Sequence, residues 1–229
     1  AVIKANGYDA SRVELFHGLS TEIELPEKVD VVVSETLDHL GVGENTIHFM
    51  QDARERMLKP GGVFLPGHLK CWVSLASPKE YARESAFWNE ELLKGYHLDY
   101  RRIGEILKNK KHVVTLHQEE LFSPWQSWQE TSFNDPEIST RSSMVTLNVK
   151  KDGEITGVGH AFEVRLCDGV MISTLPDQPP THWQQGFVPF PKPLHVKCGD
   201  RVQLEYTMDQ GADVLSLSLK RKMIHFPID

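Results

Sequence analysis

The spacing of apolar residues changes after Pro66, and this change constrains the fold of the 229-residue chain more than any other feature. Beyond Pro66, apolar and polar side chains alternate in short stretches, as they do in antiparallel strands with one buried face. Stretches of this kind occupy residues 145–149, 162–166, 202–206 and 215–219. The sequence therefore predicts that residues 67–229 form a β-barrel or a β-sandwich.

Residues 1–66 have a different character, because helical and strand-like segments follow one another. The opening heptapeptide, AVIKANG, predicts the end of a helix that stops at Gly7. The segment 29–34 is apolar on both faces, as a buried parallel strand is. The other predicted elements are a strand at 12–18, a helix at 45–59 ended by the Lys-Pro-Gly-Gly of residues 59–62, and a strand at 63–66. This order predicts half of a doubly wound α/β domain.

A third segment, residues 78–111, is helical in composition and rich in large apolar side chains. Apolar side chains at helical spacing usually pack into the core of their own domain. Alternatively, the segment forms a projecting arm, over about residues 79–108, that offers these side chains to a second subunit. The side chains concerned are Phe87, Trp88, Leu92, Leu93, Tyr96, Leu98 and Tyr100. On the residues alone, both interpretations stay open.

The segment after the apolar run 31–33 reads SETLDHLGVGE and carries Glu35 and Glu44 nine positions apart. A carboxylate pair at the carboxyl edge of a parallel strand can converge on one small cation if Gly41 and Gly43 let the chain fold back. A guanidinium suits such a pair, because carboxylates bind its planar donors in charge-assisted contacts. The alternative is that Glu35 is a solvated residue at a strand end and that Glu44 favours the first turn of a helix.

Composition narrows the function classes. The formal net charge is -7, with 32 Asp and Glu against 25 Lys and Arg, which argues against a nucleic-acid binder and favours cationic partners. Cys71, Cys167 and Cys198 lie far apart without metal-ligand or disulfide spacing, so we expect no metal site and three buried thiols. The sequence shows neither a run of about 18 apolar residues nor a signal-peptide pattern, which predicts a soluble intracellular protein without membrane contacts.

The loop that carries Ser34, Glu35 and Glu44, together with the THW of residues 181–183, resembles the signature of the protein arginine methyltransferases. Members of that family carry a paired-glutamate loop after the fourth strand of the methyltransferase domain and a Thr-His-Trp loop near the end of a barrel. The first loop is matched by Ser34, Glu35 and Glu44, and the second by the THW of residues 181–183. Further matching segments are LPEKVD at 25–30, LKPGG at 58–62, and Trp88 with Asn89 at the start of the arm. The resemblance covers nearly the whole chain.

The resemblance implies a fold and an activity. It implies the C-terminal half of a Rossmann-like methyltransferase domain, followed by a β-barrel with an inserted helical dimerisation arm. Family members transfer a methyl group from S-adenosylmethionine to an arginine nitrogen of a protein and release S-adenosylhomocysteine. Carried over to this chain, Glu35 and Glu44 become catalytic residues, and Thr181, His182 and Trp183 become residues that bind the substrate arginine. The alternative for His182 is a packed histidine at the edge of the barrel.

The match to the family's cofactor site is partial. Gly18, Ser20 and Thr21 match the loop that contacts the adenine, although the glutamate usual there is replaced by Thr21 and Glu22 stands next to it. In the family, the glycine-rich turn and the acidic residue that grips the ribose precede the helix with which this sequence begins. Two interpretations follow. Either an N-terminal fragment completes the cofactor site, or the chain is a regulatory subunit that binds and activates an arginine methyltransferase.

Departures from the family pattern bear on the product and the partners. Most members follow the first glutamate with a Trp-Met-Gly-Tyr type of segment, whereas residues 36–39 read TLDH, and the following LGVGE is similar to the branch that stops at monomethylarginine. The resemblance also implies a homodimer formed through the arm, and protein substrates with arginine-rich segments such as RGG or histone-like tails. We expect the protein in the cytoplasm, with the nucleus as a further location.

Overall fold

The computed structural model describes residues 2–8, 10–88, 95, 101–135, 143–211 and 214–224. Its α/β part contains α1 (Val2–Ala5), a 3-10 turn at Ala10–Arg12, β1 (Val29–Val33), α2 (Thr46–Arg56) and β2 (Leu58–Leu65). The strands β1 and β2 pair in parallel, and α2 connects them, so the predicted strand-helix-strand unit is confirmed. After α1, Gly7 takes a φ of 72°, the left-handed conformation that ends helices.

The Lys-Pro-Gly-Gly segment at residues 59–62 was predicted to end a helix. It lies inside β2 instead. The helix α2 has already stopped at Arg56. The parallel register shifts between the first and third residues of β1, so residues 59–62 bulge out of the ladder. Gly61 takes a φ of 81° in this bulge, which glycine adopts at little steric cost. The sequence correctly predicted a break at these residues. The break interrupts a strand, however, and not a helix.

Two further predictions for the α/β part are wrong. The predicted strand at 12–18 is not formed, because residues 13–17 have no regular structure and are exposed. Strands need neighbours for their hydrogen bonds, and the described strands pair with one another elsewhere. The strand β1 was predicted to be buried, yet Val31 and Val33 are 46% and 74% exposed. Among the described residues β1 pairs only with β2, so one of its edges is open.

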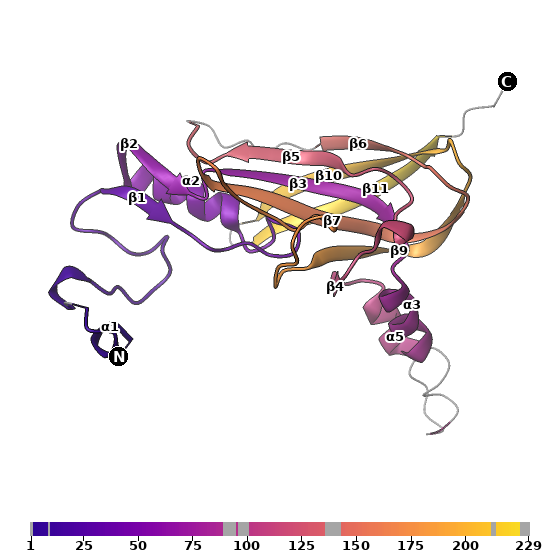
Figure 1. The fold of residues 1–229 in the computed structure, drawn as a ribbon, viewed down its shortest axis with the longest axis horizontal. Helices are drawn as coiled ribbons and strands as arrows, with labels where there is room; N and C mark the ends of the chain where they lie inside the picture. Colours follow the sequence, from indigo (N-terminus) through magenta and orange to yellow (C-terminus); the bar gives the residue numbers. More distant parts are fainter. Residues whose placement is uncertain are drawn as a thin grey trace.

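Antiparallel strands build the rest of the molecule in two sheets (Figure 1). The larger sheet has the order β4-β9-β7-β3-β5, with β8 paired to β7, and the smaller has the order β11-β10-β6. The larger sheet consists of β3 (His68–Ala76), β4 (His112–Val114), β5 (Gln126–Ser132), β7 (Gly153–Cys167), β8 (Val170–Ser173) and β9 (Gln185–Val196). The smaller consists of β6 (Ser143–Asn148), β10 (Arg201–Gly211) and β11 (Val214–Ile224). These strands confirm that the alternation after Pro66 marks antiparallel strands.

One hydrophobic core joins the two sheets. Along β6, Val145 and Leu147 are buried while their neighbours are not, as alternation predicted. Trp128 of the larger sheet stacks on Tyr206 of the smaller, with ring centroids 4.4 Å apart. The Tyr206 hydroxyl also lies 3.1 Å from Nε2 of His160 in β7. These aromatic and polar contacts hold the sheets face to face, which gives the loops at their edges a packed base.

Helices α3 (Lys79–Ala86) and α5 (Arg101–Leu107) stand away from the two sheets (Figure 1). Their base is packed, because the Tyr81 ring contacts the rings of His112 and Phe187 at centroid distances of 4.9 Å and 5.0 Å. Phe87, directly after α3, is 45% exposed. Several side chains predicted to cover the arm lie outside the described residues, namely Leu92, Leu93, Tyr96, Leu98 and Tyr100. What these side chains contact therefore stays a prediction.

Only one of the three cysteines is buried, contrary to the prediction. Cys71 on β3 is inaccessible, whereas Cys167 and Cys198 are exposed. Cys167 ends β7, and Cys198 lies in the turn between β9 and β10, where side chains commonly face solvent. Within the described ranges, no helix combines the length and apolar character needed to cross a membrane.

Candidate active site

The loop between β1 and α2, residues 34–44, is here called the glutamate loop. Its middle is buried, because Leu37, Asp38 and residues 40–42 face the sheet. Glu35 and Glu44 are exposed at its two ends. One Glu35 oxygen accepts the Leu37 N–H at 3.4 Å, where the chain turns inward directly after the first glutamate. Both glutamates are therefore open to solvent, at the two ends of a loop whose middle is packed against the sheet.

A buried carboxylate, Asp38, holds the middle of the glutamate loop in its folded-back form. Its Oδ1 accepts the N–H of Leu40 at 2.9 Å and the N–H of Gly43 at 2.8 Å. Its Oδ2 pairs with Nζ of Lys111, which lies between α5 and β4. Asp38 is only 4% exposed, so its charge depends on these donors rather than on water.

Three glycines allow the glutamate loop to pack closely. Gly41 has a φ of 87°, and a Cβ on it would lie 3.0 Å from Sγ of Cys71 in β3. A Cβ on Gly43 would lie 2.0 Å from Oδ2 of Asp38. A Cβ on Gly186 in β9 would lie 2.8 Å from a leucine methyl of the loop. Side chains at these positions would therefore push the loop away from the sheet or expel the buried carboxylate.

Two hydrogen bonds join the glutamate loop to the Thr-His-Trp segment at residues 181–183. The indole Nε1 of Trp183 donates to the carbonyl of Leu37 at 2.8 Å. Nδ1 of His39 lies 2.5 Å from the carbonyl of Trp183, and because a carbonyl only accepts, we assign a proton to Nδ1. The Trp183 ring also packs edge-on against Phe162 of β7, with centroids 5.5 Å apart. The structure thus brings together the two segments whose residues were predicted to share a site.

The three residues of the Thr-His-Trp segment are placed differently. The Trp183 N–H is already used by the loop, so this side chain braces the glutamate loop. His182 is exposed and its ring packs at a tilt against Trp183, with ring centroids 3.8 Å apart, so its imidazole is the group that can meet a ligand. The Thr181 hydroxyl is buried and finds no hydrogen-bond partner among the described residues. A bound polar group could satisfy this hydroxyl.

The predicted adenine loop, residues 18–22, is attached to α2 through Arg56. Arg56 donates to the carbonyl of Ser20 at 2.6 Å and to the carbonyl of Ile23 at 2.8 Å. Both carboxylate oxygens of Asp52, one helical turn earlier, hold the same guanidinium at 2.8 Å and 2.6 Å. The side chains predicted to contact the cofactor are exposed or half-buried. The backbone of this loop is thus fixed to α2, while the side chains at residues 20 and 21 stay accessible.

Sequence reasoning missed the residues that hold these loops in place: Asp38, His39, Arg56, Lys111 and Gly186. One signal was available, because Asp38 stands among leucines of the loop, and a carboxylate among apolar neighbours needs partners. Its partner Lys111 lies 73 positions further along the chain. Only the folded topology brings that lysine to the loop.

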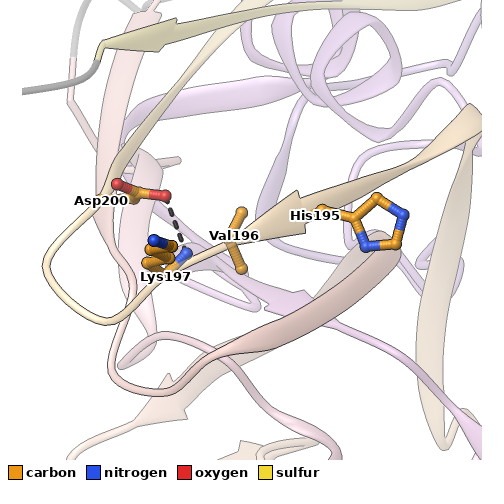
Figure 2. Close-up of a pocket in the computed structure, with 4 residues that line it drawn as sticks. All are labelled: His195, Val196, Lys197 and Asp200. Carbon is orange, nitrogen blue, oxygen red and sulfur yellow. Dashed lines mark hydrogen bonds between the residues drawn. The ribbon is translucent and has the colours of Figure 1, made fainter.

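A separate surface hollow lies at the C-terminal end of β9, whereas the Thr-His-Trp segment precedes the N-terminal end of this strand (Figure 2). It has a volume of about 410 Å³ and is lined by His195, Val196, Lys197 and Asp200. The Asp200 carboxylate accepts the Lys197 N–H at 2.8 Å, a contact internal to the turn between β9 and β10. His195 points away from this pair and lies 3.3 Å from Glu154. The polar groups of the hollow bond to one another within the turn or to the neighbouring strand β7. The glutamate loop is therefore the stronger candidate site.

Sequence comparison identifies relatives of the chain. A family model described as the arginine methyltransferase oligomerization subdomain matches residues 70–220. The probable protein arginine N-methyltransferase 6 of Arabidopsis thaliana is 25% identical over 257 residues, which cover 93% of this chain and 58% of that protein. The arginine N(omega)-methyltransferase of Streptomyces achromogenes subsp. streptozoticus is 28% identical over 183 residues, which cover 79% of this chain and 49% of that protein. The chain thus spans about half to two thirds of the length of the curated relatives it matches.

Two solved structures share the fold. The Trypanosoma brucei PRMT1 enzyme-prozyme heterotetrameric complex with AdoHcy gives a TM-score of 0.75 at 19% identity, over 98% of this chain and 77% of that chain. Arabidopsis thaliana protein arginine methyltransferase 10, in an open conformation, gives a TM-score of 0.69 at 20% identity, over 98% of this chain and 78% of that chain. At these identities the likeness concerns the fold, whereas the family model matches most of the sequence itself. The chain therefore belongs to the protein arginine methyltransferase family.

Proposed function

We propose that this protein transfers a methyl group from S-adenosylmethionine to a guanidinium nitrogen of arginine in protein substrates. One observation carries the proposal: the glutamate loop and the Thr-His-Trp segment are joined by the Trp183–Leu37 and His39–Trp183 hydrogen bonds. This joint keeps Glu35, Glu44 and His182 on loops that are packed against each other. Membership of the family and the names of its relatives support the same activity.

The chemistry of arginine explains why two carboxylates are needed. The guanidinium stays protonated and its nitrogen lone pairs are delocalised, so the free side chain is a poor nucleophile. Glu35 and Glu44 would hold its N–H groups in charge-assisted hydrogen bonds and draw the positive charge toward the bound nitrogens. The remaining nitrogen would then be oriented for attack. Positioning of this kind can supply several kcal/mol of the barrier reduction, on the order of 7–11 kcal/mol in well-oriented systems.

His182 and Trp183 would have separate tasks in substrate binding. The exposed imidazole of His182 would make a polar contact with the bound arginine or its peptide. The indole of Trp183 would limit the width of the pocket indirectly, because it fixes the loop that carries Glu35. The Thr181 hydroxyl, which has no hydrogen-bond partner within the described part of the chain, would bond to the same ligand.

The residues of this chain fit one end of S-adenosylmethionine. The sulfonium group of that cofactor supplies the methyl group when it is bound. The loop that contains Gly18, Ser20 and Thr21 would lie along the adenine. Its backbone is held by hydrogen bonds from Arg56. We propose that an N-terminal fragment covers the open edge of β1 and completes the site for the ribose and the methionine part. Val31 and Val33 lie two positions apart, on one face of β1, and their exposure supports a fragment that covers this face as well as the edge.

Methylation assays on glutamate variants of the complete protein test the activity. Glu35→Gln and Glu44→Gln keep the size of the side chain and remove the charge, so each should lower methyl transfer to an arginine-rich peptide by at least about 100-fold. Glu55→Gln, an exposed glutamate on α2, is the matched control and should retain full activity. Undiminished transfer by Glu35→Gln would refute the proposed role. We also propose monomethylarginine as the product, which mass spectrometry of the peptide distinguishes from dimethylarginine.

A regulatory subunit is the second candidate, and a mixing experiment separates it from the enzyme. One structural neighbour is an enzyme-prozyme complex, which shows that this fold occurs in such assemblies. Calorimetry with S-adenosylhomocysteine would be run on this chain alone and after addition of the N-terminal fragment. Binding that appears only with the fragment supports a divided enzyme. Activation of a separate methyltransferase, without cofactor binding by this chain, would support the regulatory role instead.

We further propose that the protein forms a homodimer through the arm, over about residues 79–108, and that residues 1–66 and 67–229 work as cofactor and substrate domains. The match to an oligomerization subdomain supports the dimer. Phe87 and Ile106, 45% and 59% exposed on the arm, are apolar side chains that a second subunit would cover. Phe87→Glu should shift the sedimentation coefficient toward the monomer at micromolar concentration. Met171→Glu on β8, 61% exposed outside the arm, should not.

A further inference from the structure

We propose that Asp38 and Lys111 form a positioning pair that sets the distance between the two glutamates. The inference rests on the proposed function, because it concerns the loop that would grip the substrate arginine. Neither side chain would contact substrate or cofactor, and both would act through the backbone of the glutamate loop. Their contacts, burial and place in the fold support the assignment.

The hydrogen bonds of Asp38 span the part of the loop that must fold back. Oδ1 receives the N–H of Leu40 at 2.9 Å and the N–H of Gly43 at 2.8 Å, so one oxygen closes the turn directly before Glu44. The second glutamate is thereby attached to a carboxylate that lies only three positions after Glu35 in the sequence. Without this closure, residues 40–43 would lose their common acceptor, and Glu44 would no longer have a defined place relative to Glu35.

The fit around Asp38 is close enough to select one conformation. A Cβ on Gly43 would lie 2.0 Å from Oδ2 and 2.4 Å from Cγ of Asp38. No side chain other than hydrogen can therefore stand at residue 43 while the carboxylate keeps its place. The sequence pattern of Asp38 followed by Gly43 is thus one structural unit, in which the glycine leaves the space that the carboxylate fills.

Lys111 supplies the charge that makes this burial possible. Its ammonium pairs with Oδ2 of Asp38, and its side chain is 45% exposed while that of Asp38 is 4% exposed. A buried carboxylate without its partner is strongly destabilised, since the cost of removing it from water is no longer offset. Lys111 lies between α5 and β4, so the pair also ties the glutamate loop to the base of the arm.

Asp38 cannot take the catalytic role itself. Both of its oxygens have donors from the protein, and its low exposure keeps a substrate guanidinium away from it. Its influence on the reaction must therefore pass through Leu40 and Gly43 to Glu44. This predicts a loss in the rate of the bound complex rather than a general loss of cofactor binding.

The test uses the complete protein and compares Lys111→Met with Lys111→Arg and Lys110→Met. Lys111→Met should lower kcat for peptide methylation by roughly 10- to 100-fold, with an unchanged KM for S-adenosylmethionine, because small errors in placement have effects of that size. Lys111→Arg should restore most of the rate. Lys110→Met removes an exposed neighbouring charge and should leave the rate unchanged.

A second variant distinguishes the pair from a general structural effect. Asp38→Asn keeps an oxygen acceptor for the two amides but has no charge to neutralise, so the double variant Asp38→Asn with Lys111→Met should be several-fold more active than Lys111→Met alone. Hydrogen exchange gives a readout without turnover: the amides of Leu40 and Gly43 should lose protection in Asp38→Ala. Equal activity of Lys111→Met and Lys110→Met, with unchanged protection in Asp38→Ala, would overturn the inference. That result leaves the proposed function intact if Glu35→Gln is still inactive.

Discussion

The indole N–H of Trp183 donates a 2.8 Å hydrogen bond to the backbone carbonyl of Leu37, two positions after Glu35. The bond crosses from the turn before β9 to the loop after β1. Its return partner, His39 to the Trp183 carbonyl, makes the connection a closed pair of contacts. The β-sheet part of the molecule therefore decides where the first glutamate of the α/β part stands.

Trp183→Phe should separate this hydrogen bond from the packing of the ring. Phenylalanine keeps an aromatic contact with Phe162 but has no N–H, so we expect a loss of about 1 kcal/mol in the free energy of unfolding. The amides of the glutamate loop should exchange faster. Trp72→Phe is the matched control, since Trp72 donates a 2.7 Å hydrogen bond to Glu163 outside the site. Trp72→Phe should lose a similar amount of stability, but the amides of the glutamate loop should exchange at the parent rate. Equal exchange rates of these amides in the two variants would contradict the prediction.

Two glycines with nearly the same backbone angle predict different costs. Gly61 has a φ of 81°, and a Cβ at this position would have no atom within 4 Å. Gly61→Ala should therefore lower the free energy of unfolding only through backbone strain, by about 1–2 kcal/mol. Gly41→Ala has a φ of 87° and also brings the Cβ to 3.0 Å from Cys71 and Phe162. We expect Gly41→Ala to lower the midpoint of urea denaturation further than Gly61→Ala. Equal midpoints would show that the loop can move off the sheet without loss.

Burial of His160 predicts a specific dependence of stability on pH. Its removal from water lowers the pKa of the imidazole from 6.5 to about 4, because the charged form is not solvated in the core. Between these two values the unfolded chain binds a proton that the folded protein does not. Stability from this group is therefore complete above pH 6.5 and falls as the pH drops toward 4, by up to about 3 kcal/mol in total.

His160→Gln should remove this contribution. Between pH 7.5 and pH 5, the fall in the free energy of unfolding should be about 2 kcal/mol smaller in His160→Gln than in the parent protein. Urea denaturation at the two pH values measures the difference. His182→Gln, which removes an exposed histidine, serves as the control and should keep the parent's pH dependence. An unchanged fall in His160→Gln would show that the ring takes up its proton in the folded state.

The thiols should react in two classes. Burial, with the nearby Asp38 as a smaller cause, raises the pKa of the Cys71 thiol far above its ordinary value, so this group should resist alkylation and disulfide exchange. Cys167 and Cys198 are exposed. Ellman's reagent should therefore detect two thiols in the native protein and the third only after denaturation. Cys71→Ala should leave the native count unchanged, and a native count of three would mean that β3 opens.

Local patterns predicted the strands well and the chain breaks only in part. Alternation at residues 145–149 identified β6 because one face of that strand is buried against the other sheet. The Pro-Gly-Gly within residues 59–62 indicated a break but not which element it interrupts, since a bulge and a helix end use the same residues. The segment RVELFHG at 12–18 suggested a strand, yet a strand exists only where a neighbour supplies hydrogen bonds.

The candidate site shows the same limit. Glu35, Glu44 and the Thr-His-Trp segment could be proposed from spacing and resemblance, because each is a short pattern in the sequence. The Asp38–Lys111 pair could not, because its partners are 73 positions apart and lie next to each other only after β4 has joined β9. Contacts of this kind depend on topology, and no local pattern encodes them.

The absence of a side chain at Gly186 has a consequence for protein engineering. The glutamate loop rests directly on the backbone of β9 at this point, and a methyl group there would meet a leucine methyl of the loop at 2.8 Å. A loop transplanted into a relative with a larger residue in β9 would be held at a different height above the sheet. Exchange of substrate preference between family members by loop grafting should therefore require transfer of the β9 position together with the loop.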